Sequence, residues 1–373
     1  MKPKIYLFTD WFFPGYLAGG PIKSAVEMIN LCGGELDFKV VTRNTDWNSN
    51  KPYEIEPDKW LHQNNYEIIY LSKNYLSFIY QILHSLEDSD IVFFNGIYSP
   101  QFNSLPIILS LILKKRSRII ISARGMLNQN AIKLKSFKKR LLLIVFRFLN
   151  IENLCVLHAA SEGEVQSIKR IFPKSKVRLA SNIPALPSLE PLIVKSSPFR
   201  KFVSVGRISP VKNTEFLVEI MSHFDELELT LIGTADDKEY LERCKNQARV
   251  SDGICFAGGV SPGKLNGLLN SYDFFILPTS GENFGHAIVE ALALGIPVII
   301  SDQTPWSDLD SKGAGWVLPL SNPQDWKDVI EKAMTIDLEK YSHMQAMAKQ
   351  YVQQKFKINQ IHDEYLRLFF HAN

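Results

Sequence analysis

Cysteine is scarce in this chain, and the four cysteines are scattered. They form no C-x-x-C pair and stand in no histidine-rich spacing: Cys32, Cys155, Cys244 and Cys255. This pattern argues against a zinc site and against a disulfide framework, and it is compatible with a reducing cytosol.

Long hydrophobic runs are also missing. The longest, residues 106–113 and 141–146, fall far short of the roughly 20 residues needed to cross a bilayer. Lys2 and Lys4 lead straight into a short strand-like run, so no signal peptide is expected. With 46% hydrophobic and 22% charged residues, a chain of 373 residues predicts a soluble globular protein with two domains.

Acidic residues are absent from Ile91 to Ile151, although the whole chain has a net charge of only +3. The same segment carries eleven basic residues, so the remaining 31 basic and 39 acidic residues have a net charge of −8. Such a block predicts a positively charged face on one domain. The eleven are Lys114, Lys115, Arg116, Arg118, Arg124, Lys133, Lys135, Lys138, Lys139, Arg140 and Arg147.

Short apolar runs alternate with segments of helical period, which predicts parallel sheets covered by helices on both faces. Strands are expected at 4–10, 38–43, 66–71, 90–96, 118–124 and 154–160, and again at 201–207, 227–233, 253–259, 273–280, 297–302 and 315–320. Residues 183–200 carry four prolines and no helical period, as a linker does. We therefore expect a first domain over 1–185, a linker over 186–200, a second domain over 201–350, and a C-terminal helix over 351–373, for which packing back on the first domain is one arrangement.

Three segments lie where strands should end, at the sheet edge where open α/β sheets bind ligands. The first places Gly15, Gly19 and Gly20 ahead of a helix, whose N-terminus attracts anions. It is not the G-x-G-x-x-G fingerprint of dinucleotide-binding proteins, and an ordinary long loop is the alternative.

The second segment ends a strand with Gly206 and Arg207, and Lys212 follows before the next helix. Two cations at this position suit a diphosphate, because arginine binds as a fork and lysine as a mobile point charge. The alternative is a solvated basic loop.

The third segment, SGENFGHAIVEALALGIPV, places Glu282 and Glu290 eight residues apart around Gly285. Backbone amides near Phe284 and Gly285 at a helix start favour a phosphate. Glu282 alone reads equally as an acid attracted to a helix N-terminus. Glu290 has apolar neighbours, and a carboxylate there is costly without a partner.

With these residues in place, the chain resembles a retaining, nucleotide-sugar-dependent glycosyltransferase of family 4 type with the GT-B fold. The most specific match is E-x7-E at Glu282 and Glu290, and G-R-x4-K at Gly206, Arg207 and Lys212 supports it. Residues 123–127, 158–164, 256–260 and 301–306 are also similar to the family. The resemblance implies an α/β protein with two Rossmann-like domains facing a cleft and a C-terminal helical tail.

The resemblance implies catalytic roles for Arg207, Lys212 and Glu282, the first two on the diphosphate and Glu282 on the transferred sugar. It places the donor at Gly19, Gly20, Gly206, Asn283, Phe284, Gly285 and Glu290, with Glu290 on the ribose. Family members keep the anomeric configuration, many of them without a metal, and no suitable D-x-D motif is present. We therefore expect no metal and no cofactor, and a UDP-sugar in preference to a GDP-sugar.

Arg124 departs from the family, in which many members have a histidine before the glycine of this loop. An arginine cannot act as a general base. Binding of the acceptor or of the donor diphosphate is the functional reading, and packing or a surface salt bridge is the alternative.

The expected activity is hexosyl transfer to a glycan or polyprenyl-diphosphate-linked acceptor in the assembly of cell-surface polysaccharide, O-antigen or lipopolysaccharide. The alternatives are a sugar-nucleotide epimerase of similar fold and a non-catalytic donor-binding partner subunit. The basic helix with Ile132, Phe137, Leu141 and Leu142 predicts peripheral attachment to an anionic membrane on its cytoplasmic side, unless its apolar side packs on the sheet. Nucleic acid is not an expected partner, because no binding motif accompanies the basic residues.

Overall fold

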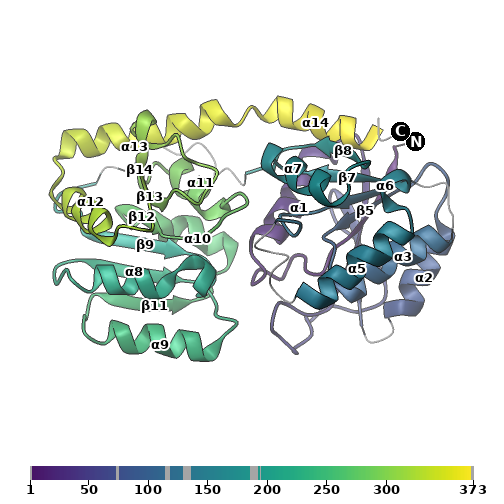
Figure 1. The fold of residues 1–373 in the computed structure, drawn as a ribbon, viewed down its shortest axis with the longest axis horizontal. Helices are drawn as coiled ribbons and strands as arrows, with labels where there is room; N and C mark the ends of the chain where they lie inside the picture. Colours follow the sequence, from purple (N-terminus) through teal and green to yellow (C-terminus); the bar gives the residue numbers. More distant parts are fainter. Residues whose placement is uncertain are drawn as a thin grey trace. The chain divides into compact units, whose positions relative to one another are not determined.

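The computed structural model describes residues 2–72, 75–113, 118–128, 136–184, 192–193 and 195–370. The chain forms two compact units, Met1–Ile183 together with Ile358–Asn373, and Pro184–Lys357 (Figure 1). Residues 186–191 and 194 of the expected linker lie outside the described residues. So do Ile132 and the basic residues Lys114, Lys115, Arg116, Lys133 and Lys135.

The first unit is built on one sheet of eight strands in the order β3-β4-β2-β1-β5-β6-β7-β8. All neighbouring pairs are parallel except β3 with β4. The strands are β1 Lys4–Phe8, β2 Asp37–Arg43, β3 Trp60–His62, β4 Tyr66–Leu71, β5 Ile91–Asn95, β6 Arg118–Ser122, β7 Cys155–Ala159 and β8 Lys176–Leu179. The central strands are buried on both faces, which is why each reads as a continuous apolar run.

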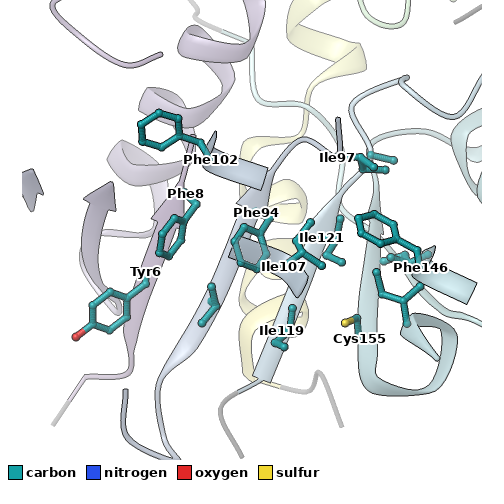
Figure 2. Close-up of a cluster of buried hydrophobic side chains, with 14 of the residues drawn as sticks. Tyr6, Phe8, Phe94, Ile97, Phe102, Ile107, Ile119, Ile121, Phe146 and Cys155 are labelled. Carbon is teal, nitrogen blue, oxygen red and sulfur yellow. The ribbon is translucent and has the colours of Figure 1, made fainter. Parts of the chain in front are cut away.

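Helices cover this sheet, and one hydrophobic cluster joins several of them to one of its faces. In Figure 2, Phe8, Phe94 and Ile121 from the strands lie with Ile107 and Phe146 from the covering helices. The helices of the unit are α1 Gly20–Cys32, α2 Tyr75–Ser85, the π-helical turn η1 Pro100–Ser104, α3 Leu105–Ile112, α5 Ser136–Phe148, α6 Ile151–Leu154, α7 Glu162–Ile171 and α14 Ile358–Phe370.

The C-terminal helix α14 belongs to the first unit, although the second unit precedes it in the chain. Its Phe369 ring contacts the rings of Phe38 in β2 and Phe93 in β5. The second unit extends to Lys357, beyond the expected end at residue 350, because helix α13 runs without a break from Leu338 to Lys355.

The second unit has a six-stranded, fully parallel sheet in the order β11-β10-β9-β12-β13-β14. Its strands are β9 Lys201–Val205, β10 Glu228–Ile232, β11 Ile254–Gly258, β12 Phe274–Leu277, β13 Val298–Ser301 and β14 Gly315–Leu318. Its helices are the short η2 Pro210–Lys212 and η3 Asp310–Lys312 with α8 Thr214–Met221, α9 Lys238–Ala248, α10 Pro262–Leu269, α11 His286–Ala293, α12 Pro323–Thr335 and α13 Leu338–Lys355.

The expected mixed α/β architecture with two parallel-sheet domains and a helical C-terminal region is confirmed. Among the described residues, no helix is both long and apolar enough to span a membrane.

Candidate functional site

The predicted donor-site residues of the second unit gather at one edge of its sheet. Strands β9, β12 and β13 are adjacent and parallel, so their carboxyl ends meet there. Gly206 and Arg207 follow β9, and the loop that leads from β12 into α11 contains Glu282, Asn283 and Phe284.

Lys212 and Glu282 form a partly buried ion pair. The lysine stem crosses directly over Gly206, where a β-carbon would lie 3.3 Å from the Lys212 Cε atom. A side chain at position 206 would therefore press against the lysine stem, which would have to shift by a few tenths of an ångström.

Backbone and side-chain hydrogen bonds fasten the turn that carries Lys212 to the loop that carries Glu282. The carbonyl of Val211 accepts from the Ser280 amide at 2.8 Å and from the Thr279 hydroxyl at 3.0 Å. The Glu282 amide donates to the Gln303 carbonyl at 3.1 Å. The pair is thus held between three segments, so its position does not depend on one flexible loop.

Arg207 lies at the same edge but not in this ion pair. Its Nη1 is 3.0 Å from Asp236, and the side chain is about half exposed. The structure thus brings Gly206, Lys212 and Glu282 together and leaves Arg207 at the rim of the group.

Gly285 is the N-cap of α11 and has a left-handed backbone, with φ at 80°. This conformation favours glycine, and it directs the loop into the helix that follows. The carbonyl of Phe284 accepts a 2.6 Å hydrogen bond from the indole of Trp306. Asn283 is partly exposed beside it.

Glu290 lies inside α11 and is buried, 3% exposed, among the buried Val289 and Ala291. It has an interaction partner within the protein. The buried carboxylate therefore has the partner that its apolar surroundings require.

In the first unit, Gly19 is the N-cap of α1 with φ at 71°, and a β-carbon there would meet nothing within 4 Å. The Asp46 carboxylate accepts from the amides of Tyr16 at 2.9 Å and Leu17 at 3.3 Å. Asp46, in the loop after β2, therefore supports the backbone of the loop that precedes Gly19. Gly20 is the first residue of α1.

Arg124 also lies in the first unit, in the left-handed region with φ at 49°. Its Nε donates to Asn95 at 2.7 Å and its Nη1 to Asn182 at 2.6 Å. Asn95 in turn donates to the Pro21 carbonyl at 3.5 Å, in the first turn of α1. A chain of hydrogen bonds thus joins Arg124 to the first turn of α1. Two of its guanidinium nitrogens have a structural role inside the protein, as the alternative interpretation of this residue expects.

Glu164 lies at the end of the segment 158–164, which is similar to the family, but no site pattern in the sequence singles it out. It is buried, and its two carboxylate oxygens accept from the amides of Gly125 and Ala160, the latter at 2.7 Å. It therefore fixes the loop that carries Arg124.

His158 is fully buried between the Ser122 hydroxyl at 2.9 Å and the Ala180 carbonyl at 2.8 Å. Burial, together with the nearby Arg124 guanidinium, lowers the pKa of His158 to about 3. The imidazole is therefore neutral at physiological pH.

Known proteins resemble part of this chain in sequence and its whole length in fold. Residues 193–351 match the family described as Glycosyl transferases group 1. The GDP-mannose:cellobiosyl-diphosphopolyprenol alpha-mannosyltransferase of Komagataeibacter xylinus is 27% identical over 128 residues, which cover 33% of each chain. Matched segments cover 26–34% of the length of the first curated relatives.

Two solved structures extend the likeness to the whole chain. Sucrose-phosphate synthase from Thermosynechococcus elongatus has a TM-score of 0.76 at 18% identity and covers 100% of both chains. An Anabaena protein in complex with UDP and glucose has a TM-score of 0.69 at 15% identity, with 99% of both chains covered.

The chain therefore has the fold of these proteins, and the expected resemblance to glycosyltransferases of the GT-B fold is confirmed. In sequence, the likeness to the glycosyl transferases group 1 family is confined to residues 193–351.

Proposed function

We propose that this protein is a retaining hexosyltransferase that moves a sugar from a nucleotide diphosphate sugar to a glycan or lipid-linked acceptor. The observation that carries the proposal is the Lys212–Glu282 ion pair above Gly206, at the sheet edge where α11 begins. It joins a cation suited to a diphosphate with an acid suited to sugar hydroxyls.

Donor binding exchanges the partners of this pair. Lys212 turns from Glu282 to the diphosphate, and the released carboxylate accepts hydrogen bonds from the hydroxyls of the transferred sugar. Breaking a partly buried ion pair is unfavourable unless both members find new partners. A complete donor supplies both, whereas a nucleotide without the sugar leaves Glu282 unpaired.

The leaving group of the reaction is the nucleotide diphosphate, so catalysis requires positive charge where negative charge develops. Lys212 and Arg207 supply it from side chains, and the amides around Phe284 and Gly285 add the N-terminus of α11. Gly19 and Gly20 contribute the N-terminus of α1. Glu290 binds the ribose, Gly206 makes room for Lys212, and Asn283 contacts the donor from the loop.

Similar proteins support our choice of acceptor and donor base. One structural relative binds UDP, and one sequence relative is named for GDP-mannose and a diphosphopolyprenol acceptor. We propose a UDP-sugar without a metal, and a polyprenyl-diphosphate-linked acceptor in cell-surface polysaccharide or O-antigen assembly. Arg124 is the proposed acceptor contact, and the protein acts on the inner face of the cell membrane as a peripheral protein.

A thermal-shift panel of UDP, GDP, UDP-sugars and GDP-sugars tests the donor site, because a ligand that binds the folded state raises the melting temperature. We expect stabilisation by uridine compounds, larger with the sugar attached. Absence of any shift would refute the donor site. Incubation with the stabilising sugar nucleotide alone then identifies an epimerase, which isomerises its sugar without an acceptor. A non-catalytic binding subunit would bind the nucleotide but show no turnover with any lipid extract.

A further inference from the structure

The helices over one face of the first unit's sheet carry many apolar side chains on their outer sides. Helices α2, α3, α5 and α6 all send side chains into the same buried cluster, so their other sides form one outer face (Figure 1). Of the fifteen large hydrophobic side chains exposed in the described part of the chain, nine lie on these four helices. They are Leu76, Tyr80, Leu105, Ile112, Phe137, Leu141, Ile144, Phe148 and Leu154.

Helix α5 has the clearest pattern. Its exposed apolar residues follow spacings of four, three and four, which places them on one stripe of a helix. They are Phe137, Leu141, Ile144 and Phe148, exposed by 80%, 54%, 61% and 88%. The opposite side of the same helix packs on the sheet through Leu143 and Phe146.

The packing corrects one expectation from the sequence. Leu142 was expected in the outward stripe, but it packs against the buried cluster. The helix nevertheless remains apolar on the outside, because Ile144 and Phe148 continue the stripe that Phe137 and Leu141 begin. A helix apolar on two sides has a second surface to cover, and patches of this kind mark interaction sites.

The charges around the stripe identify what covers it. Lys138 and Arg140 are exposed beside it, and Arg147 is exposed near its end, with one nitrogen 2.7 Å from the Ile171 carbonyl. No acidic residue occurs between Ile91 and Ile151, and the next one, Glu152, accepts a hydrogen bond from the Lys174 amide at 2.8 Å. An apolar stripe with a cationic rim complements anionic headgroups above acyl chains.

We infer that the stripe Phe137–Leu141–Ile144–Phe148 inserts into an anionic lipid surface, with Lys138 and Arg140 at the headgroups. A second copy of this chain is a poorer partner, because pairing the same face would place these cations against each other. The inference deepens the proposed function and rests on it for the lipid-linked acceptor, which this surface would bring within reach.

Cosedimentation with vesicles tests the inference without donor or acceptor. We expect the full chain to bind phosphatidylcholine mixed with phosphatidylglycerol far better than phosphatidylcholine alone. Changing the four stripe residues to Gln should abolish binding to both, and Lys138→Gln with Arg140→Gln should weaken binding to the anionic vesicles about 30-fold.

Matched variants in the second unit serve as controls. Val250→Gln with Leu338→Gln, and Lys238→Gln with Lys264→Gln, change exposed residues of the same kinds and should bind like the wild type. If the fourfold variant has a lower melting temperature than the wild type, the double variant Phe137→Gln with Phe148→Gln replaces it, since both side chains are at least 80% exposed.

Wild-type binding by the stripe variants overturns the inference. The inference is also overturned if size-exclusion chromatography shows a dimer that only the stripe variants dissociate, because a second copy of the chain then covers the stripe. The outcome is separate from that of the proposed function: vesicle binding without any nucleotide shift refutes the donor site alone, and nucleotide shifts without vesicle binding refute the lipid surface alone.

Discussion

The indole Nε1–H of Trp306 donates a 2.6 Å hydrogen bond to the carbonyl oxygen of Phe284. The two rings also meet edge to face, and Phe356 packs against both. Phe284 immediately precedes the N-cap of α11, so Trp306 fixes the direction of the amides that follow. Trp306 is therefore a positioning residue for the loop of the proposed donor site.

Trp306→Phe keeps an aromatic ring and removes the hydrogen bond. We expect about a 3- to 10-fold rise in the donor KM and a smaller thermal shift with UDP, in line with about 0.5–1.5 kcal/mol for one neutral hydrogen bond. Trp326→Phe is the matched control, because its indole bonds the Pro319 carbonyl at 2.9 Å elsewhere in the unit. Equal donor KM values in both variants would contradict the positioning role.

Lys212→Met removes the charge that faces Glu282 and keeps most of the stem that crosses Gly206. We expect kcat/KM to fall about 100- to 1000-fold, the usual effect of removing one donor from a site of developing negative charge. The melting temperature should also fall, because Glu282 is left unpaired.

Adding Glu282→Gln to Lys212→Met separates the two effects. The double variant should regain melting temperature while activity stays low, since the unpaired carboxylate is gone and the cation is still missing. If the double variant regains activity as well, the pair is structural and the proposed exchange of partners is wrong.

Glu290→Gln keeps the shape of the side chain but removes its charge. The proposed ribose contact predicts about 10- to 100-fold weaker binding of UDP, because hydrogen bonds to a charged group contribute about 1.5–3 kcal/mol, and unchanged binding of pyrophosphate, which has no ribose. Titration calorimetry measures both, with the exposed Glu219→Gln as control. An equal loss for the two ligands would mean that Glu290 only supports the helix.

Arg124→Lys keeps the positive charge but cannot hold Asn95 and Asn182 at once. We expect a loss of about 1.5–3 kcal/mol in the free energy of unfolding, measured in urea, against little change for the exposed Arg170→Lys. If Arg124 also contacts the acceptor, the acceptor KM rises while the donor KM does not. An unaltered acceptor KM leaves packing as its only role.

The sequence alone predicts most of the sheet strands because buried parallel strands require uninterrupted apolar runs, as in Ile91–Asn95 and Val298–Ser301. Two strands were missed for physical reasons. The edge strand Lys176–Leu179 alternates exposed charged residues with partly buried ones, and Trp60–His62 has only three residues. Helix Leu105–Ile112 is too uniformly apolar to show a helical period.

The candidate site likewise contains residues that the sequence indicates and contacts that it does not. Lys212, Glu282 and Gly285 were predictable because each lies in a short loop with its own pattern. The bonds of Trp306 to Phe284 and of Arg124 to Asn182 join residues 22 and 58 positions apart. Such contacts depend on how strands are ordered in the sheet, and local spacing carries no information about that.

His158 makes the stability of the first unit sensitive to acid. Its pKa is lowered by burial to about 3 in the folded protein, against about 6.5 when unfolded. Between these values the unfolded state binds a proton that the folded state does not, so stability is present above about pH 6.5 and falls as the pH drops. From about pH 7 to about pH 5 this residue alone should remove about 2 kcal/mol from the free energy of unfolding.

Urea unfolding of the wild type and of His158→Gln at both pH values measures this contribution. Glutamine can still bond Ser122 and Ala180 but does not titrate, so the variant should lose about 2 kcal/mol less than the wild type on acidification. His62→Gln is the matched control, because it makes the same substitution at a side chain that is 83% exposed. Identical losses in the wild type and in His158→Gln would show that the buried imidazole takes up its proton without unfolding.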